Sequence, residues 1–314
     1  MGHQNECPSI SHSCIQFMSN IAVVVIALII GLLLQKTKRF PDNAASTLNL
    51  YVIYVALPAL ILAEIPQLSF SHEALVPVIA AWAIMLISAV LTWGTARLMK
   101  WPRGLTGALM LLVPLGNTGF VGIPLIEAHL GSKAIPYAIL YDQLGTFVAL
   151  NTYGIVVACY YSSGSTSAGK ILRNILIFPP FIALILAFAA SPFNYPEWLA
   201  AALARISSTL VPVVMVAVGL QWRLSLSPEY LSPLAVGLLY ILLVSPALAY
   251  LGLWIFDIDG LVAQAVILEA AMPAMISAGV LAIGHNLAPR FASSLVGYSL
   301  LIGLISVWVW RLFI

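Results

Sequence analysis

Long apolar stretches alternate with short polar segments along almost the whole chain. A helix needs about 20 mostly apolar residues to cross a bilayer. Five stretches in the first half meet that requirement, at residues 17–34, 46–63, 74–99, 105–125 and 135–160. Five more follow a segment rich in Ser and Gly, at residues 171–189, 198–220, 231–256, 261–283 and 291–313. The pattern predicts an all-α membrane protein with ten transmembrane helices.

Prolines recur at corresponding places in the two halves of the chain. The second span of each half contains one, Pro58 and Pro212, and the fourth span of each half contains another, Pro114 and Pro273. Because five is an odd number, a duplicated five-span unit sits in the membrane with opposite topology, as in the inverted repeats of many secondary transporters. We therefore expect a first repeat at residues 1–160, a connecting loop at 161–170 and a second, inverted repeat at 171–314.

The fourth span contains a stretch, residues 112–124, that is a poor continuous helix. Pro114 removes a backbone hydrogen bond from a helix and clashes with the carbonyl of Met110. Asn117 and three glycines, at positions 116, 119 and 122, weaken a helix further. Unpaired backbone groups are tolerated in a membrane only where they are buried in protein or line a cavity. We therefore expect a broken helix beside a cavity.

Asn117 is suited to cap a second half-helix that begins near Thr118. Such a helix start leaves free N–H groups and a partial positive charge in the middle of the membrane, where they would attract an anion. In the alternative interpretation, Gly119 and Gly122 merely allow close packing between helices.

The ninth span repeats this logic around Pro273, which can open a second half-helix and free the carbonyl of Glu269. In an inverted pair the two breaks cross near the middle of the membrane, so that helix ends and freed carbonyls surround one small site. We expect the substrate contacts at these breaks, namely Pro114, Gly116, Asn117, Thr118, Gly119, Met272, Pro273 and Ala274.

Two acidic residues, Glu269 and Asp142, fall inside predicted spans. A carboxyl group at such depth is costly unless it is paired, hydrated or protonated. We expect Glu269 to bind a proton or a cation that is coupled to transport, and a sodium ion is conceivable there. Asp142 could serve coupling or substrate contact. For both residues, a structural hydrogen bond to a neighbouring helix is the alternative.

Composition and charge narrow the class of protein further. Apolar residues make up 62% and charged residues 8% of the chain, far from the usual proportions of roughly a half and a quarter, which excludes a soluble fold. The net charge is +2, and no basic face of a nucleic-acid binder is evident. We find no phosphate-binding loop and no nucleophile and base at recognisable spacing. We therefore expect neither an enzyme nor a cofactor.

Positive residues lie mainly at span ends that share one side of the membrane. Cytoplasmic loops retain Lys and Arg, so both termini are predicted to be external. The residues on the cytoplasmic side are Lys36, Lys38, Arg39, Arg97, Lys100, Arg103, Lys170, Arg173, Arg223 and Arg290. Cys7 and Cys14 precede the first span and could be bridged if the tail faces an oxidising compartment.

Several motifs together resemble the auxin efflux carrier family, which includes bacterial transporters of malonate-like acids and the plant auxin exporters. The most specific motif is residues 116–124, Gly-Asn-Thr-Gly-Phe-Val-Gly-Ile-Pro. The other motifs that carry the resemblance over nearly the whole chain are Gly31, Leu48-Asn49, Ala56-Leu57-Pro58, Leu210-Val211-Pro212, Gly219, Ala270-Ala271-Met272-Pro273 and Ser293-Ser294.

The resemblance implies two inverted five-helix repeats with crossing fourth and ninth helices, related in architecture to sodium/bile acid symporters. It implies a scaffold of helices 1, 2, 6 and 7, in which Asn49, Pro58 and Pro212 lie, and a transport domain of helices 3–5 and 8–10 that moves like an elevator. It also implies substrate contact at Asn117 and near Pro273. Plant exporters typically carry Gln at the position of Glu269, so their uncoupled export does not transfer directly.

We therefore expect a secondary transporter of a small organic anion, such as malonate, malate or an auxin-like acid, surrounded by membrane lipid. The expected location is the bacterial inner membrane, and two copies could pair through the scaffold helices. The alternatives are a sodium-coupled bile-acid-type symporter, a cation/proton antiporter, a channel or a sensor. Tyr141-Asp142 resembles half of an intramembrane aspartyl protease site, but the second motif, Gly-x-Gly-Asp, is missing.

Overall fold

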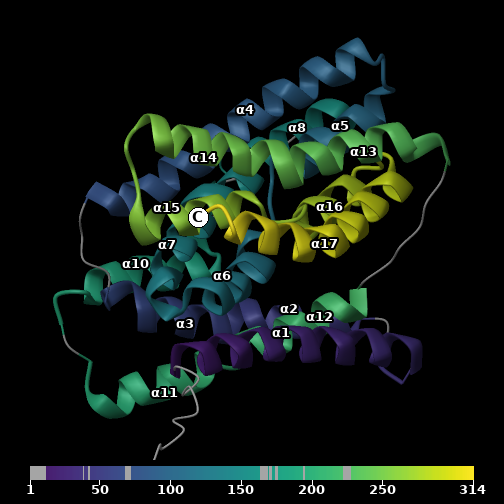
Figure 1. Ribbon diagram of the computed structural model, residues 1–314. Helices are drawn as coiled ribbons and strands as arrows, with labels where there is room; N and C mark the ends of the chain where they lie inside the picture. Colours follow the sequence, from purple (N-terminus) through teal and green to yellow (C-terminus); the bar gives the residue numbers. More distant parts are fainter. Residues whose placement is uncertain are drawn as a thin grey trace, which may run out of the picture.

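The computed structural model describes residues 12–37, 39–41, 43–67, 72–162, 169, 172–173, 176–193, 195–221 and 228–314. The regular secondary structure in these residues is helical (Figure 1), which confirms the predicted all-α class. One isolated β-bridge is the exception. Cys7, the side chain of Cys14 and most of the predicted connecting loop lie outside the described residues.

The helices follow the predicted spans closely. The α-helices of the first half are α1 (His12–Thr37), α2 (Ala44–Tyr51), α3 (Leu57–Glu64), α4 (Val76–Leu98), α5 (Arg103–Leu112), α6 (Ile123–Leu130), α7 (Ile135–Leu140) and α8 (Ile155–Ser162). Those of the second half are α10 (Pro179–Ala190), α11 (Glu197–Ser207), α12 (Leu210–Gln221), α13 (Leu231–Leu239), α14 (Ser245–Ile255), α15 (Gly260–Ala270), α16 (Ile276–Gly284) and α17 (Pro289–Arg311).

Wider and tighter helical turns connect several of these helices. The π-helical turns are η1 (Val52–Ala56), η4 (Thr118–Gly122), η6 (Tyr141–Phe147), η7 (Leu150–Gly154) and η9 (Tyr240–Val244). The 3-10 turns are η2 (Ile65–Gln67), η3 (His72–Leu75), η5 (Ser132–Ala134) and η8 (Pro228–Tyr230). π-Turns are rare and often occur at functional sites.

Six helical stretches of the described chain are long and apolar enough to cross a membrane. They are Ala44–Glu64, Val76–Leu98, Ser132–Ser162, Glu197–Gln221, Pro228–Ile255 and Pro289–Arg311. Shorter apolar helices occupy the other predicted spans, at Ala22–Thr37, Arg103–Leu112, Thr118–Leu130, Pro179–Ala190 and Gly260–Ala270. The fourth and ninth spans fall short because each is interrupted. The count of ten and the inverted repeat stay predictions.

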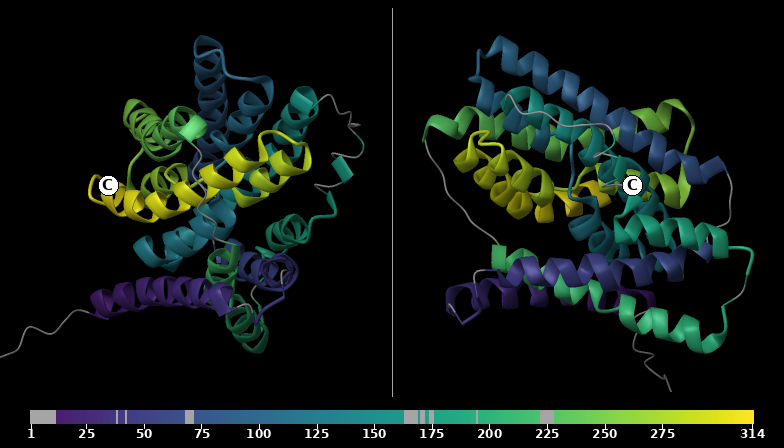
Figure 2. Two further views of the ribbon diagram at one scale, coloured as in Figure 1. Left: turned by 90° about the vertical axis from the view of Figure 1, so that its right-hand side faces the viewer. Right: turned by 180° about the vertical axis from the view of Figure 1, so that it is seen from behind.

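The helices form two groups, which both views in Figure 2 separate. In the first group, α12 packs on α1 and α2, while α10 and α11 pack on α3. In the second group, α4, α5, α8 and α13 to α17 lie together above it in Figure 1, and the π-turn η6 packs on α4 of this group. Helices α6 and α7 lie between, and α6 contacts both α1 and α15. The first group contains the helices that the resemblance assigns to a scaffold.

Two glycines allow α1 and α12 to pack with their backbones in contact. A Cβ atom on Gly31 would lie 2.4 Å from the carbonyl oxygen of Val216, and one on Gly219 would lie 2.6 Å from that of Leu28. Small residues at helix contacts are typical of membrane proteins. This close approach explains why glycines occur at both of these motif positions.

The prolines of the second and seventh spans do not separate these spans into half-helices. Pro58 lies in the first turn of α3, directly after the π-turn η1, and the helical stretch Ala44–Glu64 continues through it. Pro212 lies in the first turn of α12, after two turn residues at 208–209. Asn49 lies in α2, partly buried. These residues therefore shape the helices of the first group without interrupting them as Pro114 and Pro273 do.

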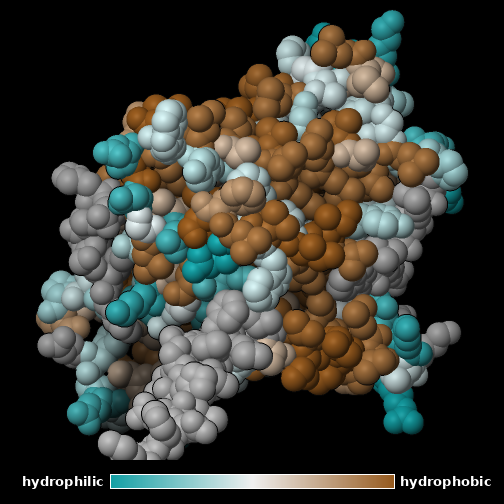
Figure 3. Space-filling view, viewed as in Figure 1, coloured by the Kyte–Doolittle hydropathy of each residue, from teal (hydrophilic) through white to brown (hydrophobic). Residues whose placement is uncertain are grey.

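The molecular surface is apolar over broad areas. Figure 3 shows hydrophobic residues across the face formed by α13, α14 and α17, and again over α1. Trp254 of α14 is 72% exposed and Ile305 of α17 is 65% exposed. Soluble monomers rarely expose such extended apolar surface, so these faces are explained by contact with lipid.

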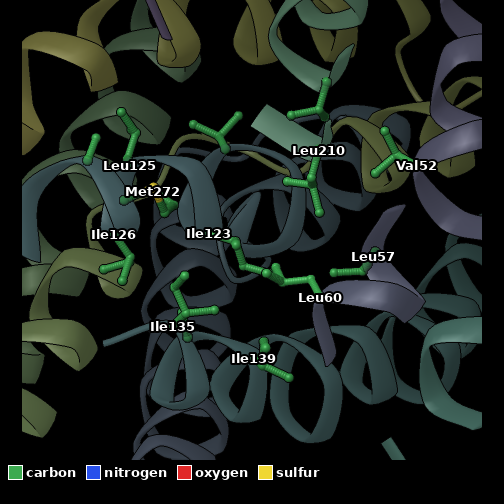
Figure 4. Close-up of a cluster of buried hydrophobic side chains, with 14 of the residues drawn as sticks. Val52, Leu57, Leu60, Ile123, Leu125, Ile126, Ile135, Ile139, Leu210 and Met272 are labelled. Carbon is green, nitrogen blue, oxygen red and sulfur yellow. The ribbon is translucent and has the colours of Figure 1, made fainter. Parts of the chain in front are cut away.

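A cluster of buried apolar side chains joins the first group to α6 and α7 (Figure 4). Leu57 and Leu60 of α3 and Leu210 of α12 come from the first group, and Ile123 of α6 and Ile139 of α7 face them. Several long-range hydrogen bonds, in contrast, lie within one group. Tyr51 bonds Thr209 in the first, while Trp82 bonds the Leu144 carbonyl, Ser88 bonds Ser245 and Thr95 bonds Tyr240 in the second.

Candidate functional site

The interruptions of the fourth and ninth spans lie side by side. Between α5 and η4, Gly116 forms an antiparallel bridge with Ala274, which lies between α15 and α16. The Asn117 N–H donates to the Pro273 carbonyl at 2.7 Å, and the Met275 N–H donates to the Leu115 carbonyl at 2.9 Å. The two broken segments therefore provide hydrogen-bond partners for some of each other's backbone N–H and C=O groups in the interior of the molecule.

Side chains satisfy further backbone groups at the breaks. The Met110 carbonyl, which Pro114 deprives of its helical donor, accepts a hydrogen bond from the Tyr153 hydroxyl at 2.8 Å. The Ala274 N–H donates to the Ser299 hydroxyl at 3.1 Å. These partners allow an interrupted backbone to exist away from water.

One expectation about the second break is wrong. The Glu269 carbonyl is not free, because it accepts a hydrogen bond from the Met272 N–H at 3.2 Å. The chain tightens into a turn after Ala270, the last residue of α15, and this turn supplies a new donor in place of the one that Pro273 removes.

A cavity of about 280 Å³ lies between the first group of helices and the two breaks. Its polar lining consists of Asn117, Gly119, Asp142, Gln143, Asn151 and Ser277. Its apolar lining consists of Ile53, Leu57, Phe120, Phe147, Leu150, Phe178 and Met275. Phe147 stacks on Phe178 with ring centroids 3.9 Å apart. The size and the mixed lining are those of a site for a small organic molecule.

Both second half-helices begin at the wall of this cavity. Gly119 and Phe120 lie in the first turn of η4, and Ser277 lies in the first turn of α16, next to Met275. N–H groups in a first helical turn lack helical acceptors and carry a partial positive charge. The lining residues, all of them within the described chain, include no Lys, Arg or His. Positive potential at this wall therefore comes from the helix starts, and at η4 the Gly119 N–H already donates to the Asp142 carboxyl.

Asn117 lies at the start of the second half-helix, but its side chain does not cap it. The helical turn begins at Thr118, as predicted, and the Asn117 carbonyl accepts from Val121 at 3.2 Å and from Gly122 at 3.0 Å. The side chain makes no capping hydrogen bond, and its Nδ2 is buried without a partner among the described residues. Because a buried unpaired donor is costly, this amide is available for a ligand in the adjoining cavity.

Asp142 contributes a carboxyl group that is tied to the first break. Thr118 Oγ1 donates to Asp142 Oδ1 at 2.6 Å, and Gln143 Nε2 donates to Oδ2 at 2.6 Å. Thr118 Oγ1 also lies 2.8 Å from Thr146 Oγ1. Asp142 is therefore both a wall of the cavity and a partner of the helix start that forms the site.

Glu269 lines a second, much smaller cavity of about 20 Å³, which also contacts Thr118, Thr146 and Ser245. The side chain is 1% exposed, and neither carboxyl oxygen has a hydrogen-bond partner among the described residues. A Cβ atom on Gly122 would lie 2.2 Å from Glu269 Oε2. The cavity has space for about one water molecule. Thr118 and Thr146 thus lie between the two buried carboxyl groups.

The structure distributes the predicted contact residues over both cavities. Asn117 and Gly119 line the larger one, while Pro114, Gly116, Thr118 and Met272 line the smaller one. Pro273 and Ala274 form the backbone pairing between the breaks. Sequence reasoning missed Gln143, Asn151, Ser277 and Phe178 as wall residues. Of these four residues, only Gln143 and Ser277 could have been inferred from the sequence. Gln143 follows Asp142 directly, and Ser277 lies just after the second break.

Comparisons with known proteins agree with this picture. A family model described as a membrane transport protein matches residues 16–311. An uncharacterized transporter of Methanothermobacter thermautotrophicus is 29% identical over 295 residues, which cover 91% of this chain and 95% of the relative. An uncharacterized transporter of Methanocaldococcus jannaschii is 28% identical over 312 residues, covering 94% and 98%. The chain belongs to the membrane transport protein family, that of the auxin efflux carriers, and is a membrane transporter rather than an enzyme.

Proposed function

We propose that this protein is a secondary transporter of a small organic anion, such as a malonate-like carboxylate. The observation that carries the proposal is the cavity of about 280 Å³ at which two half-helices begin. A substrate carboxylate would accept hydrogen bonds from first-turn N–H groups other than that of Gly119, which already donates to Asp142. It would also accept one from Asn117 Nδ2, which is buried without a partner among the described residues. The apolar wall around Phe147 and Phe178 would contact the carbon skeleton.

We further propose ten spans in two inverted repeats, with alternating access produced by elevator-like movement of the second group of helices, together with α6 and α7, against the first. The contact in Figure 4 supports this movement, because apolar packing is non-directional and tolerates sliding. Hydrogen bonds such as Tyr51 to Thr209 and Ser88 to Ser245 hold each group together internally. The protein would lie in the plasma membrane with both termini outside.

The lining of the cavity supports coupling to protons. An anion would meet the Asp142 carboxyl without a basic side chain to offset repulsion, so transport requires that the acid be neutralised. We propose that Asp142 and Glu269 carry protons, which exchange along the hydroxyls of Thr118 and Thr146. At the breaks, the carbonyls of Leu115 and Pro273 each accept one N–H group, which leaves one lone pair on each for a cation.

The test is transport by the purified protein in liposomes. Labelled malonate, malate and indole-acetate would be offered under imposed proton, sodium and electrical gradients. The proposal predicts saturable uptake and counterflow of a carboxylate, stimulated by a proton gradient and indifferent to sodium. Sodium dependence would favour the bile-acid-type alternative and overturn proton coupling. Flux without saturation or counterflow would indicate a channel and overturn the carrier mechanism.

A further inference from the structure

A third cavity lies away from the breaks, where α4 ends, α5 begins and α8 ends. The cavity measures about 300 Å³ and is lined by Trp93, Ala96, Arg97, Lys100, Trp101, Arg103, Thr106, Tyr160 and Tyr161. Three of these residues are cationic, and none is acidic. A concave surface with this charge favours an anionic ligand.

The two arginines of this cavity are held in place by its aromatic walls. The Arg103 Nε donates to the Tyr161 carbonyl at 3.2 Å, and a second guanidinium N–H donates to the Tyr160 carbonyl. The same guanidinium lies 5.1 Å from the centroid of the Tyr160 ring, and that of Arg97 lies 4.8 Å from the centroid of Trp93. These contacts reduce the side-chain freedom that a ligand would otherwise have to restrict.

The start of α5 adds to the positive potential. The helix begins at Arg103 after Pro102, and no side chain caps it. First-turn N–H groups of a helix carry a partial positive charge, which favours phosphate groups. Thr106, one turn further on, also lines the cavity, and its hydroxyl donates to the Pro102 carbonyl at 3.2 Å.

The surroundings of the cavity indicate a lipid rather than a free anion. On α4 and just beyond it, Val90 is 67% exposed, Leu98 84% and Met99 51%. Such side chains suit contact with acyl chains, while Trp and Tyr are enriched at the level of the headgroups. We propose that this cavity binds the phosphate headgroup of an anionic phospholipid, whose acyl chains extend along α4. The proposal does not rest on the proposed transport function.

Native mass spectrometry of the detergent-purified protein would test this site. The protein would be titrated with phosphatidylglycerol and phosphatidylcholine of equal chain length, with and without inorganic phosphate. We expect phosphatidylglycerol to be retained in preference to phosphatidylcholine, and millimolar phosphate not to displace it. Equal retention of both lipids, or full displacement by phosphate, would overturn the lipid assignment.

Charge-neutralising variants locate the site. In the double variant Arg97→Gln/Lys100→Gln, Arg103 keeps its bonds to the Tyr160 and Tyr161 carbonyls. We expect retention of phosphatidylglycerol to fall by about tenfold or more, since each cation near anionic lipid contributes roughly a factor of five. The control Arg39→Gln/Arg290→Gln removes the same charge from exposed positions outside the cavity. An equal loss in both variants would show a diffuse charge effect and refute the site.

Discussion

At the scale of single residues, the decisive feature is Asn117, whose side chain is 2% exposed and whose Nδ2 has no hydrogen-bond partner in the described part of the chain. We predict that Asn117→Ala reduces carboxylate transport by about 10- to 100-fold, the loss of one hydrogen bond to a charged group. Because the amide N–H₂ group has no hydrogen bond to lose within the described residues, thermal stability in detergent should not fall.

The matched control for this variant is Asn49→Ala. Asn49 is a partly buried amide of α2 that does not line the cavity. Liposome counterflow should separate the two variants. Wild-type turnover of Asn117→Ala, or equal losses in both, would remove Asn117 from the proposed site.

The link between the two buried carboxyl groups is a second residue-scale prediction. Thr118→Val keeps the shape of the side chain but removes the hydroxyl between Asp142 and the Glu269 cavity. Stimulation of uptake by a proton gradient should then decrease strongly, as it should in Glu269→Gln, while counterflow under equal pH persists in part. To separate a loss of coupling from a loss of transport, uptake driven by a proton gradient is compared with counterflow at equal pH.

Thr152→Val serves as the control for the loss of a hydroxyl. Its hydroxyl donates to the Val148 carbonyl of its own helix at 2.7 Å. Proton-driven uptake should survive in that variant. The coupling role fails if Glu269→Gln retains both its rate and its dependence on pH.

At the scale of helices, contact between α1 and α12 depends on glycine. We predict that Gly31→Ala destabilises the protein by about 1–3 kcal/mol, because its Cβ would lie 2.4 Å from the Val216 carbonyl oxygen and force the helices apart. Gly94→Ala in α4 is the matched control, since a Cβ there would meet no atom within 4 Å. The midpoints of thermal unfolding in detergent compare the stabilities of the two variants. Equal midpoints for Gly31→Ala and Gly94→Ala would contradict the close packing of α1 on α12.

The broken fourth span depends in the same way on a distant helix. Tyr153→Phe leaves the Met110 carbonyl without the donor that lies 2.8 Å away, so we predict a loss of about 1–3 kcal/mol. Tyr250→Phe removes a hydroxyl from a residue that is 46% exposed and should have little effect. The midpoint of thermal unfolding is measured for both variants. An unchanged midpoint in Tyr153→Phe would show that the Met110 carbonyl has another hydrogen-bond donor.

At the scale of the whole molecule, the helices could be predicted well and their contacts could not. Span positions follow from apolar length, which the bilayer imposes on each segment separately. The interruptions at Pro114 and Pro273 follow from the local chemistry of proline and glycine. The predicted cap by Asn117 and the predicted free carbonyl of Glu269 were wrong. Both depend on how the chain turns after the break, and residue types alone do not determine that.

The wall of the larger cavity illustrates the same limit. Leu57 and Phe178 reach it from the first group of helices, while Gln143 and Ser277 reach it from the second. Their distance along the chain hides this convergence, because no local pattern encodes which helices become neighbours. The hydrogen bond from Thr118 to Asp142 was likewise beyond sequence reasoning, although both residues were singled out as candidates.

The most direct test of the account is a density map of the protein bound to a transported dicarboxylate in a lipid nanodisc. The account predicts ligand density between the starts of η4 and α16, with a carboxylate within about 2.7–3.2 Å of Asn117 Nδ2 and of first-turn N–H groups. Ligand density elsewhere, or unbroken helices through Asn117 and Pro273 with no cavity between them, would contradict it.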